Sequence, residues 1–379
     1  MGLLGKVKKY LPISSRSFHA NEEWQNATLQ IVQTRSTSTN DVVIQLTRQV
    51  SVLTDEITKL NQKTEDLCYR QRAIDTKQTL RFWSLYGSGA STLDDKRRFF
   101  RNLPHARGGL RLLQLALTKL LGDFADFCAE HDITHWWLIG GTLLGAERHT
   151  GFVPWDDDLD VGIMRDDLQR LIALIAADDR FEISVIWDHW AYCRQVRLYS
   201  TVPNIPGFID LFIFDWCADT SNKSFEYSLQ ARRQFISDLE SMQDELVDWC
   251  DDLMYMPINS RTGEKISAVY ERQMTILRDK GIICDSKNSV GVIRAIDNID
   301  EPNGFAWIAD NEMMFPVTYL EFEGRNFPVP AQYMYFLEHS YKDIYDLPND
   351  IGQHYEHVPH GDLERVDVRN AILAYIQKD

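Results

Sequence analysis

The sequence predicts an α+β fold in which short strands alternate with helices, preceded by a long N-terminal coiled-coil helix. Heptad-spaced apolar residues run through residues 29–81, the pattern of a coiled coil. Residues 110–131 carry a wide apolar face at helical spacing, and short apolar runs such as residues 159–164 indicate strands. These patterns divide the chain into an N-terminal helical part and a larger C-terminal domain.

The composition favours a cytoplasmic protein that does not bind nucleic acid. The chain has 379 residues and a net charge of −16, whereas phosphate backbones require a concentrated basic surface. Its six cysteines are scattered without a CxxC pair, which is typical of reduced thiols rather than of disulfides or a zinc site. We also expect neither a membrane-spanning helix nor a signal peptide, because the apolar runs are short.

Residues 1–20 are the one strongly basic part of the chain. Their cations, with no acidic residue among them, are Lys6, Lys8, Lys9 and Arg16. Apolar residues lie beside these cations at near-helical spacing, as in an amphipathic helix that contacts the inner face of the plasma membrane. A frayed terminal tail accounts for the same composition, and both interpretations are open at this point.

Residues 21–85 are expected to form a coiled coil that assembles the chain into a homo-oligomer. The heptad positions hold Leu29, Val32, Val43, Leu46, Val50, Leu53, Ile57, Leu60, Leu67 and Ile74. A narrow apolar seam of this kind is hidden from water when helices pair, and the polar residues that interrupt it set the register. The alternative is one long helix folded against its own C-terminal domain.

The rest of the chain is expected to comprise a linker at residues 86–109, with a turn-rich break at 86–98, and a domain at residues 110–379. The expected elements of that domain are a helix at 110–131, a strand within 133–141, a strand at 159–164, a helix at 165–177, a strand at 208–214, a helical insert at about 223–279, and a tail from 315 with short strands and a final helix. We interpret Trp136, Trp137 and Trp155 as core or pocket wall.

The segment GGTLLGAERHTGFVPWDDDLD at residues 140–160 carries an unusual density of charge. Its closely spaced carboxylates, which repel one another by roughly 1 to 4 kcal/mol per pair, are Asp156, Asp157, Asp158 and Asp160. On a strand, Asp158 and Asp160 point to one side and Leu159 to the other. Asp210 lies in a second apolar run, FIDLFIF, where an unpaired charge is costly. A divalent cation such as Mg²⁺ among these oxygens would offset the repulsion.

The residues before the aspartates suit an anionic ligand. Gly140 and Gly141 leave room for a phosphate to approach the backbone, and Thr142 opens a helix whose N–H groups face an anion. The cations expected to neutralise the rest of a diphosphate are Arg148, His149 and Arg165. Glycines near phosphate, carboxylates around a metal and nearby cations together favour phosphoryl transfer.

The stretch GGTLLGAERHTGFVPWDDDLDVGIMRDD resembles the signature of the LicD family, which includes the fukutin-related phosphotransferases. The resemblance covers roughly residues 110–360. It continues at IDLF (209–212), at Phe315–Pro316, at FEGRNFPVP (322–330) and at YKDIYDLP (341–348). The first motif is long and specific, so the chain is identified as a member of this family.

The resemblance implies a nucleotidyltransferase-like mixed sheet flanked by helices. It also implies transfer of a phosphocholine or phospho-polyol group from a CDP-activated donor to a hydroxyl of a cell-surface glycan, such as lipopolysaccharide, teichoic acid or capsule, or of its lipid-linked precursor. By the motif match, Asp158 and Asp160 hold Mg²⁺ or Mn²⁺ with Asp156 close by. Asp210 is the third acid, as metal ligand, as the base that activates the acceptor, or as both. Arg148, His149 and Arg165 are implied contacts to phosphate or nucleotide.

Two other functions are compatible with the residues. One is nucleotidyl transfer from a nucleoside triphosphate to a sugar phosphate, and the other is a non-catalytic oligomeric scaffold of a glycan-assembly complex. The chain departs from the family where relatives usually have Tyr-Gly-Asp, because Lys342 stands between Tyr341 and Asp343. Glu147 replaces a commonly small or apolar residue. The clustered His354, His357 and His360 are interpreted as loop residues rather than zinc ligands, since no cysteine is near.

Overall fold

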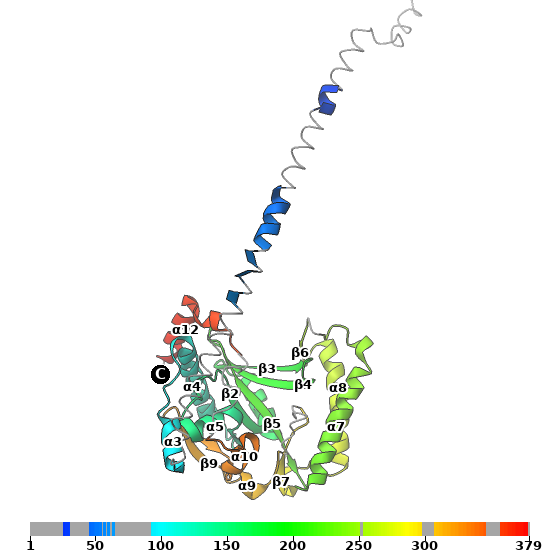
Figure 1. Ribbon diagram of the computed structural model, residues 1–379. Coiled ribbons are helices and arrows are strands. Elements are labelled where there is room, and N and C mark those ends of the chain that lie inside the picture. The colour runs from blue at the N-terminus through cyan, green and yellow to red at the C-terminus, as the bar shows by residue number, and fades with distance from the viewer. Residues whose placement is uncertain are drawn as a thin grey trace, which may run out of the picture. The chain divides into compact units, whose positions relative to one another are not determined.

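A computed structural model gives the structure of the protein (Figure 1). It describes residues 26–30, 45–54, 56–57, 59–60, 63–64, 92–250, 253–297, 307–345 and 357–377. The chain divides into two compact units, Met1–Leu80 and Arg81–Asp379. The labels of helices and strands are those of Figure 1.

The described residues of the first unit are α-helical. Their large apolar side chains are all more than half exposed: Leu29, Leu46, Val50, Val52, Leu53, Ile57 and Leu60. Apart from Val52, these are the residues of the expected heptad seam, so each described member of the seam is available to a second helix. The coiled coil and the homo-oligomer stay predictions, and the basic segment 1–20 lies outside the described residues.

The first described helix of the second unit is α3 (Leu93–Arg101), which corrects the part of the predicted turn-rich break at 86–98 that the structure describes. Thr92 is the N-cap, and its hydroxyl accepts the backbone N–H of Asp95 at 3.3 Å. The Asp95 carboxylate in turn accepts the backbone N–H of Thr92 at 3.1 Å. This reciprocal capping box starts a helix at Leu93, so the prediction was wrong over Leu93–Arg98.

An eight-stranded mixed sheet is the centre of the second unit. Its strands are β1 (Trp136–Leu138), β2 (Leu159–Met164), β3 (Phe181–Asp188), β4 (Cys193–Ser200), β5 (Ile209–Cys217), β6 (Tyr255–Pro257), β7 (Gly291–Arg294) and β8 (Ile308–Asp310). The order is β1-β2-β5-β4-β3-β6, with β7 between β5 and β8. Strands β2 and β5 are parallel and the other pairs antiparallel. The expected mixed sheet flanked by helices is therefore confirmed, whereas the hairpin of β3 and β4 was not foreseen.

Strand β5 is shared by three neighbours, and this arrangement positions the candidate site. Strand β2 follows one edge of β5, with Asp160 directly opposite Asp210. At the other edge, Arg197 of β4 lies opposite Asp210, and β7 pairs only from Phe214 onward. Directly paired residues of adjacent strands point to the same face of a sheet. Asp160, Asp210 and Arg197 therefore form one row across three strands.

Helices α4 (Gly108–Glu130), α5 (Gly140–His149) and α6 (Arg165–Ile175) contribute to the largest buried core. Leu117, Leu120 and Phe124 of α4 are buried there, as the apolar periodicity predicted. Trp136 and Trp137 of β1 are also buried, which confirms their interpretation as core. The burial of these apolar faces holds α4 and α5 against the strand ends.

A second core belongs to helices α7 (Asn222–Glu240) and α8 (Arg261–Asp279), which run side by side in Figure 1. Their short companions are the 3₁₀ helices η1 (Gln243–Glu245) and η2 (Ser286–Asn288). The two long helices agree with the helical insert predicted at about 223–279. Residues 255–257 do not, because they form β6 and extend the sheet beside β3.

Most of the C-terminal elements contact α4 or α5. They are α9 (Asn311–Met314), the hairpin of β9 (Thr318–Phe322) and β10 (Arg325–Val329), α10 (Tyr333–Tyr341), α11 (His360–Leu363) and α12 (Val366–Ile376). Helices α11 and α12 both contact α4. No helix among the described residues combines the length and the apolar character needed to cross a bilayer.

Lys342 ends α10 in a backbone conformation that favours glycine, with φ 61° and ψ −119°. This is the position where the family pattern has glycine, and a side chain in that region costs about 1 to 3 kcal/mol. We expect Lys342→Gly to raise the free energy of unfolding by about 1 kcal/mol. Urea denaturation measures the change. Lys342→Ala is the control, since alanine keeps the strained Cβ, and an equal gain in both variants would contradict the explanation.

Candidate active site

The four predicted metal-binding carboxylates come together where β2 and β5 begin. Burial raises the pKa of Asp156 and of Asp160 well above its ordinary value, and the charge of Asp158 raises both further. Burial also raises the pKa of Asp210 to about 6, although Arg197 opposes the shift. The raised pKa values show that these acidic side chains are near enough to disfavour one another's ionisation. The oxygen-rich donor set therefore fits a divalent metal ion, and its role as a ligand set stays a prediction.

The N-terminus of α5 faces Asp160. The backbone N–H of Gly141 donates to Oδ2 of Asp160 at 3.0 Å, and the backbone N–H of Asp160 donates to the Thr142 hydroxyl at 2.8 Å. Gly140 has φ 57°, and a Cβ there would collide with the Asp160 carboxylate. A Cβ on Gly141 would lie 2.9 Å from Oδ2 of Asp156. The glycines thus let two carboxylates approach the helix, and phosphate binding by this turn stays a prediction.

Arg148 and His149 lie inside the protein, 2% and 7% exposed. Burial and the adjacent Arg148 lower the pKa of His149 to about 3, so its ring is neutral at physiological pH. The ring donates from Nδ1 to the Phe100 carbonyl at 3.0 Å and accepts from Nε of Arg148, also at 3.0 Å. Arg148 also donates to the Ile344 carbonyl at 3.0 Å. These contacts hold α3 and residue 344 against α5, and a neutral His149 cannot supply the positive charge expected of it.

Arg165 is the centre of a buried ion network rather than part of the carboxylate cluster. Its guanidinium donates to both Asp215 oxygens, at 2.6 and 2.8 Å, and to Asp297 at 2.7 Å. The Tyr270 hydroxyl donates to Asp297 at 2.6 Å, and Arg194 pairs with its other oxygen. Burial disfavours ionisation of Asp297, but Arg165 and Arg194 outweigh it and hold the pKa of Asp297 below its ordinary range. The network joins α6, β4, β5 and α8, so the contacts in hand give Arg165 a structural role.

Two arginines that the sequence analysis did not single out lie at the carboxylates. Nε of Arg197 is 3.6 Å from Oδ1 of Asp210, and its guanidinium packs 4.1 Å from the centre of the Phe208 ring. Arg294 acts against the upward shift in the pKa of Asp160. Only the pairing of β4 and β7 with β5 brings them there. The arginine-containing alternation CRQVRLYS at residues 193–200 is a strand signal that could have identified Arg197.

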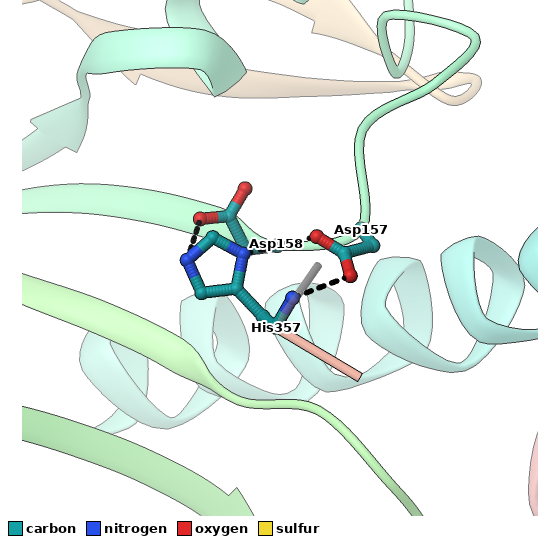
Figure 2. Close-up of side chains that lie close together, drawn as sticks. All are labelled: Asp157, Asp158 and His357. Carbon is teal, nitrogen blue, oxygen red and sulfur yellow. Dashed lines mark hydrogen bonds and ion pairs between the residues drawn. The ribbon is translucent and has the colours of Figure 1, made fainter. Parts of the chain in front are cut away.

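Glu147 and His357 also have partners that the sequence alone did not indicate. Glu147 is buried, and its carboxylate accepts the hydroxyls of Tyr345 at 2.7 Å and of Tyr333 at 3.1 Å. These hydrogen bonds to the C-terminal part of the chain explain why position 147 holds a glutamate. His357 lies in a loop, as interpreted, and its ring contacts Asp157 and Asp158 (Figure 2). His354 lies outside the described residues, as does the side chain of His360.

The raised pKa of Asp210 predicts a pH-dependent destabilisation of the metal-free protein. With a folded-state value of about 6 against an ordinary 3.8, the folded state binds the proton more tightly than the unfolded state, so stability falls as pH rises through this interval. We expect Asp210→Asn to be more stable than wild type by on the order of 2 kcal/mol above pH 6 and equal to it near pH 4. Urea unfolding in a chelator across this range measures the difference. A stability difference between Asp210→Asn and wild type that does not vary with pH would refute the raised pKa of Asp210. The control is Asp166→Asn, at an exposed position.

Comparisons with known proteins agree with this geometry. Residues 133–244, which contain β1 to β5, match the model of the "LicD/FKTN/FKRP, nucleotidyltransferase domain" family. The lipopolysaccharide cholinephosphotransferase LicD of Haemophilus influenzae is 27% identical over 267 residues, covering 66% of this chain and 96% of that protein. An uncharacterised protein of Rickettsia prowazekii is 47% identical over 85 residues, which are 22% of this chain and 32% of its own.

A third relative is the human ribitol 5-phosphate transferase FKRP, which is 54% identical over 43 residues. Those residues are 11% of this chain and 9% of the human protein, so the similarity is confined to a short motif. The Haemophilus protein, in contrast, aligns over nearly its whole length. The sheet, the carboxylate row and these matches together indicate that residues 133–244 carry the nucleotidyltransferase domain of the LicD/FKTN/FKRP family.

Proposed function

We propose that this chain transfers a phosphocholine or phospho-polyol group from a CDP-activated donor to a hydroxyl of a cell-surface glycan or its lipid-linked precursor. Relatives named for transfer of substituted phosphates, a cholinephosphotransferase and a ribitol 5-phosphate transferase, support the reaction class. The observation that carries the proposal is the row in which Asp160 and Asp210 face each other beside the N-terminus of α5. That row supplies acidic ligands and helix N–H groups in one place.

The carboxylates of Asp156, Asp158, Asp160 and Asp210 would hold a divalent cation, Mg²⁺ or Mn²⁺ in this proposal. When bound, such an ion neutralises phosphate charge and orients the transferred group. Burial and mutual repulsion raise the pKa of Asp156 and Asp160, which means that these carboxylates favour a positive ion over the empty site. Binding of a divalent cation would therefore relieve the repulsion between these carboxylates.

The residues of the row divide the remaining tasks. Asp210, with its pKa raised by burial to about 6, is placed to accept the proton of the acceptor hydroxyl as that oxygen attacks the donor phosphorus. The bond from phosphorus to the CMP oxygen breaks in the same displacement, and CMP leaves. Arg197 lies beside Asp210, and the charge of Arg294 acts on Asp160, so we assign these two cations to the donor phosphates. At the N-terminus of α5, the backbone N–H of Gly141 donates to Asp160 and so orients that carboxylate.

Identification of the small product tests the reaction class. Purified full-length protein is incubated with a divalent cation, a panel of CDP conjugates and candidate glycans, and products are resolved by ion-exchange chromatography. We expect CMP and a phosphorylated glycan. Release of pyrophosphate from a nucleoside triphosphate would establish the alternative, nucleotidyl transfer onto a sugar phosphate. Absence of turnover with a properly folded, oligomeric chain would favour the scaffold.

The first unit extends the proposal to assembly and location. The exposed heptad residues support a homo-oligomer formed through residues 21–85. The basic residues of segment 1–20 support contact with the inner, anionic face of the membrane. Sedimentation of the full chain with anionic and neutral vesicles tests the contact, which should weaken with salt.

A further inference from the structure

His357 places its two ring nitrogens against two different carboxylates. Nδ1 lies 3.0 Å from Oδ1 of Asp157, and Nε2 lies 3.4 Å from Oδ2 of Asp158. Figure 2 shows the ring between the two aspartates, which come from the segment leading into β2. His357 itself belongs to the C-terminal part of the chain, so tertiary packing alone brings the three side chains together. Their ligand atoms all lie within 4.8 Å of one another.

Asp157 and Asp158 have different tasks in this group. Asp157 is 3% exposed, and its Oδ2 accepts the backbone N–H groups of His357 at 2.8 Å and Val358 at 3.1 Å. Its Oδ1 faces Nδ1 of the ring, so both oxygens are engaged in holding His357. A carboxylate that accepts Nδ1–H fixes the tautomer in which Nε2 carries the lone pair. With a metal ion bound, Nε2 would offer that lone pair on the side of Asp158.

The pairing of Nε2 with Asp158 has the spacing of two ligands of one metal ion. Ligand atoms about 2.1 Å from a metal and at right angles to each other are separated by roughly 3 Å. A carboxylate that orients a histidine through its second nitrogen is a recurrent arrangement around protein metals. Nitrogen ligands favour transition metals, whereas Mg²⁺ prefers an all-oxygen shell.

We propose that His357, oriented by Asp157, supplies a nitrogen ligand beside Asp158, so that this centre prefers a divalent transition-metal ion such as Mn²⁺ or Co²⁺ over Mg²⁺. The inference rests on the proposed function, because it adds a ligand to the cation assigned to Asp158. It also makes the C-terminal segment part of the metal centre. Asp158 joins the two sets of ligands, with the carboxylates of the row on one side and His357 on the other.

The packing around His357 keeps its ring in this orientation. Val358 is 6% exposed and belongs to the main core. The Phe208 ring meets the His357 ring edge to face, with 6.0 Å between the centres. Helices α11 and α12 follow directly and pack on α4. A ligand held this way loses little conformational freedom when the metal binds, which strengthens binding.

Metal titrations of the full-length protein test the proposal. After removal of metals with a chelator, isothermal titration calorimetry measures binding of Mn²⁺ and of Mg²⁺, and pulsed electron paramagnetic resonance of the Mn²⁺ complex detects coupling to a ¹⁴N nucleus. In wild type we expect a Kd for Mn²⁺ about tenfold or more below that for Mg²⁺, and a ¹⁴N coupling. In His357→Gln we expect Mn²⁺ affinity to fall by about 10- to 100-fold, Mg²⁺ affinity to change far less, and the coupling to disappear.

Two further variants separate the ligand from its orienting partner and from general effects. Asp157→Asn retains an acceptor for the backbone N–H groups, so we expect it to fold and to lose part of the preference for Mn²⁺. His135→Gln is the matched control. His135 also gives its backbone N–H, at 2.8 Å, and Nδ1, at 3.0 Å, to one carboxylate, that of Asp167, but at a place remote in the fold from Asp158. It should leave binding of both metals and the ¹⁴N coupling unchanged.

The outcomes distinguish this inference from the proposed function. Absence of a ¹⁴N coupling in wild type, or an unchanged ratio of Mn²⁺ to Mg²⁺ affinity in His357→Gln, overturns the nitrogen ligand even where turnover still requires Asp158. Binding of Mn²⁺ with the coupling, in a chain that releases no CMP from any donor, supports the ligand and counts against the reaction. Failure of wild type to bind any divalent cation overturns both.

Discussion

Asp160→Asn is expected to lower kcat/KM by about 10³-fold or more while leaving the metal-free protein folded. The side chain accepts the Gly141 N–H, lies opposite Asp210 across two parallel strands and is half-buried among other carboxylates. Asparagine keeps the shape and one oxygen, so the contact to Gly141 can persist. The substitution removes the negative charge that binds the cation. It therefore lowers kcat/KM without unfolding the protein.

Three measurements support the interpretation of that loss. Steady-state kinetics with the CDP conjugate that gives turnover in the product assay yield kcat and KM. Calorimetry gives cation affinity, and thermal unfolding in a chelator gives stability. The melting temperature of metal-free Asp160→Asn should equal or exceed that of wild type, because a buried like charge has been removed. Asp166→Asn, an exposed change on α6, is the control and should keep full activity. If kcat/KM of Asp160→Asn were within about tenfold of wild type, the row of Asp160, Asp210 and Arg197 would not take part in catalysis.

Arg165→Met is expected to lower the free energy of unfolding by about 3 to 5 kcal/mol. The change leaves Asp215 and Asp297 buried, 7% and 0% exposed, without the guanidinium that donates to both. Removing one partner of a buried ion pair costs far more than the pair contributes, because the remaining charge has lost its compensation. Arg194 and Tyr270 still contact Asp297, so the larger part of the cost falls on Asp215.

Urea unfolding of Arg165→Met and of a control variant measures this cost. The control is Arg170→Met on the same helix, whose side chain is 52% exposed in its pair with Asp167, and it should lose less than about 1 kcal/mol. A variant Arg165→Met with wild-type stability and a greatly raised KM for the donor would show instead that the side chain serves the ligand. The experiment therefore decides between the role expected from the motif and the role given by its contacts.

Local patterns were sufficient wherever a residue's task follows from its neighbours in the chain. The helix predicted at 110–131 is α4, the strand predicted at 159–164 is β2, and Asp210 lies in the strand expected around it. Alternation across Leu159 correctly placed Asp158 and Asp160 apart from the core. These features depend on the side-chain periodicities of strands, two residues, and of helices, about 3.6 residues. Both can be recognised in a short stretch of sequence.

Such patterns could not predict features that depend on contacts between residues far apart in the sequence. Arg148, His149 and Arg165 lie within the motif, yet their side chains bind Ile344, Phe100, Asp215 and Asp297 inside the protein. A charge pattern cannot tell whether an arginine faces a ligand or a buried aspartate. That choice depends on which segments pack against it, and packing is a property of the whole chain.

The sequence by itself determined the family motif, the mixed α+β character and the carboxylates of the site, because each is encoded over a few consecutive residues. Only the tertiary structure decided which charges meet. Pairing of β5 with β2, β4 and β7 assembled Asp160, Asp210, Arg197 and Arg294, and the C-terminal segment brought His357 to Asp157 and Asp158. Electrostatic interactions depend on separation in space and on burial, and neither quantity is fixed by separation along the chain.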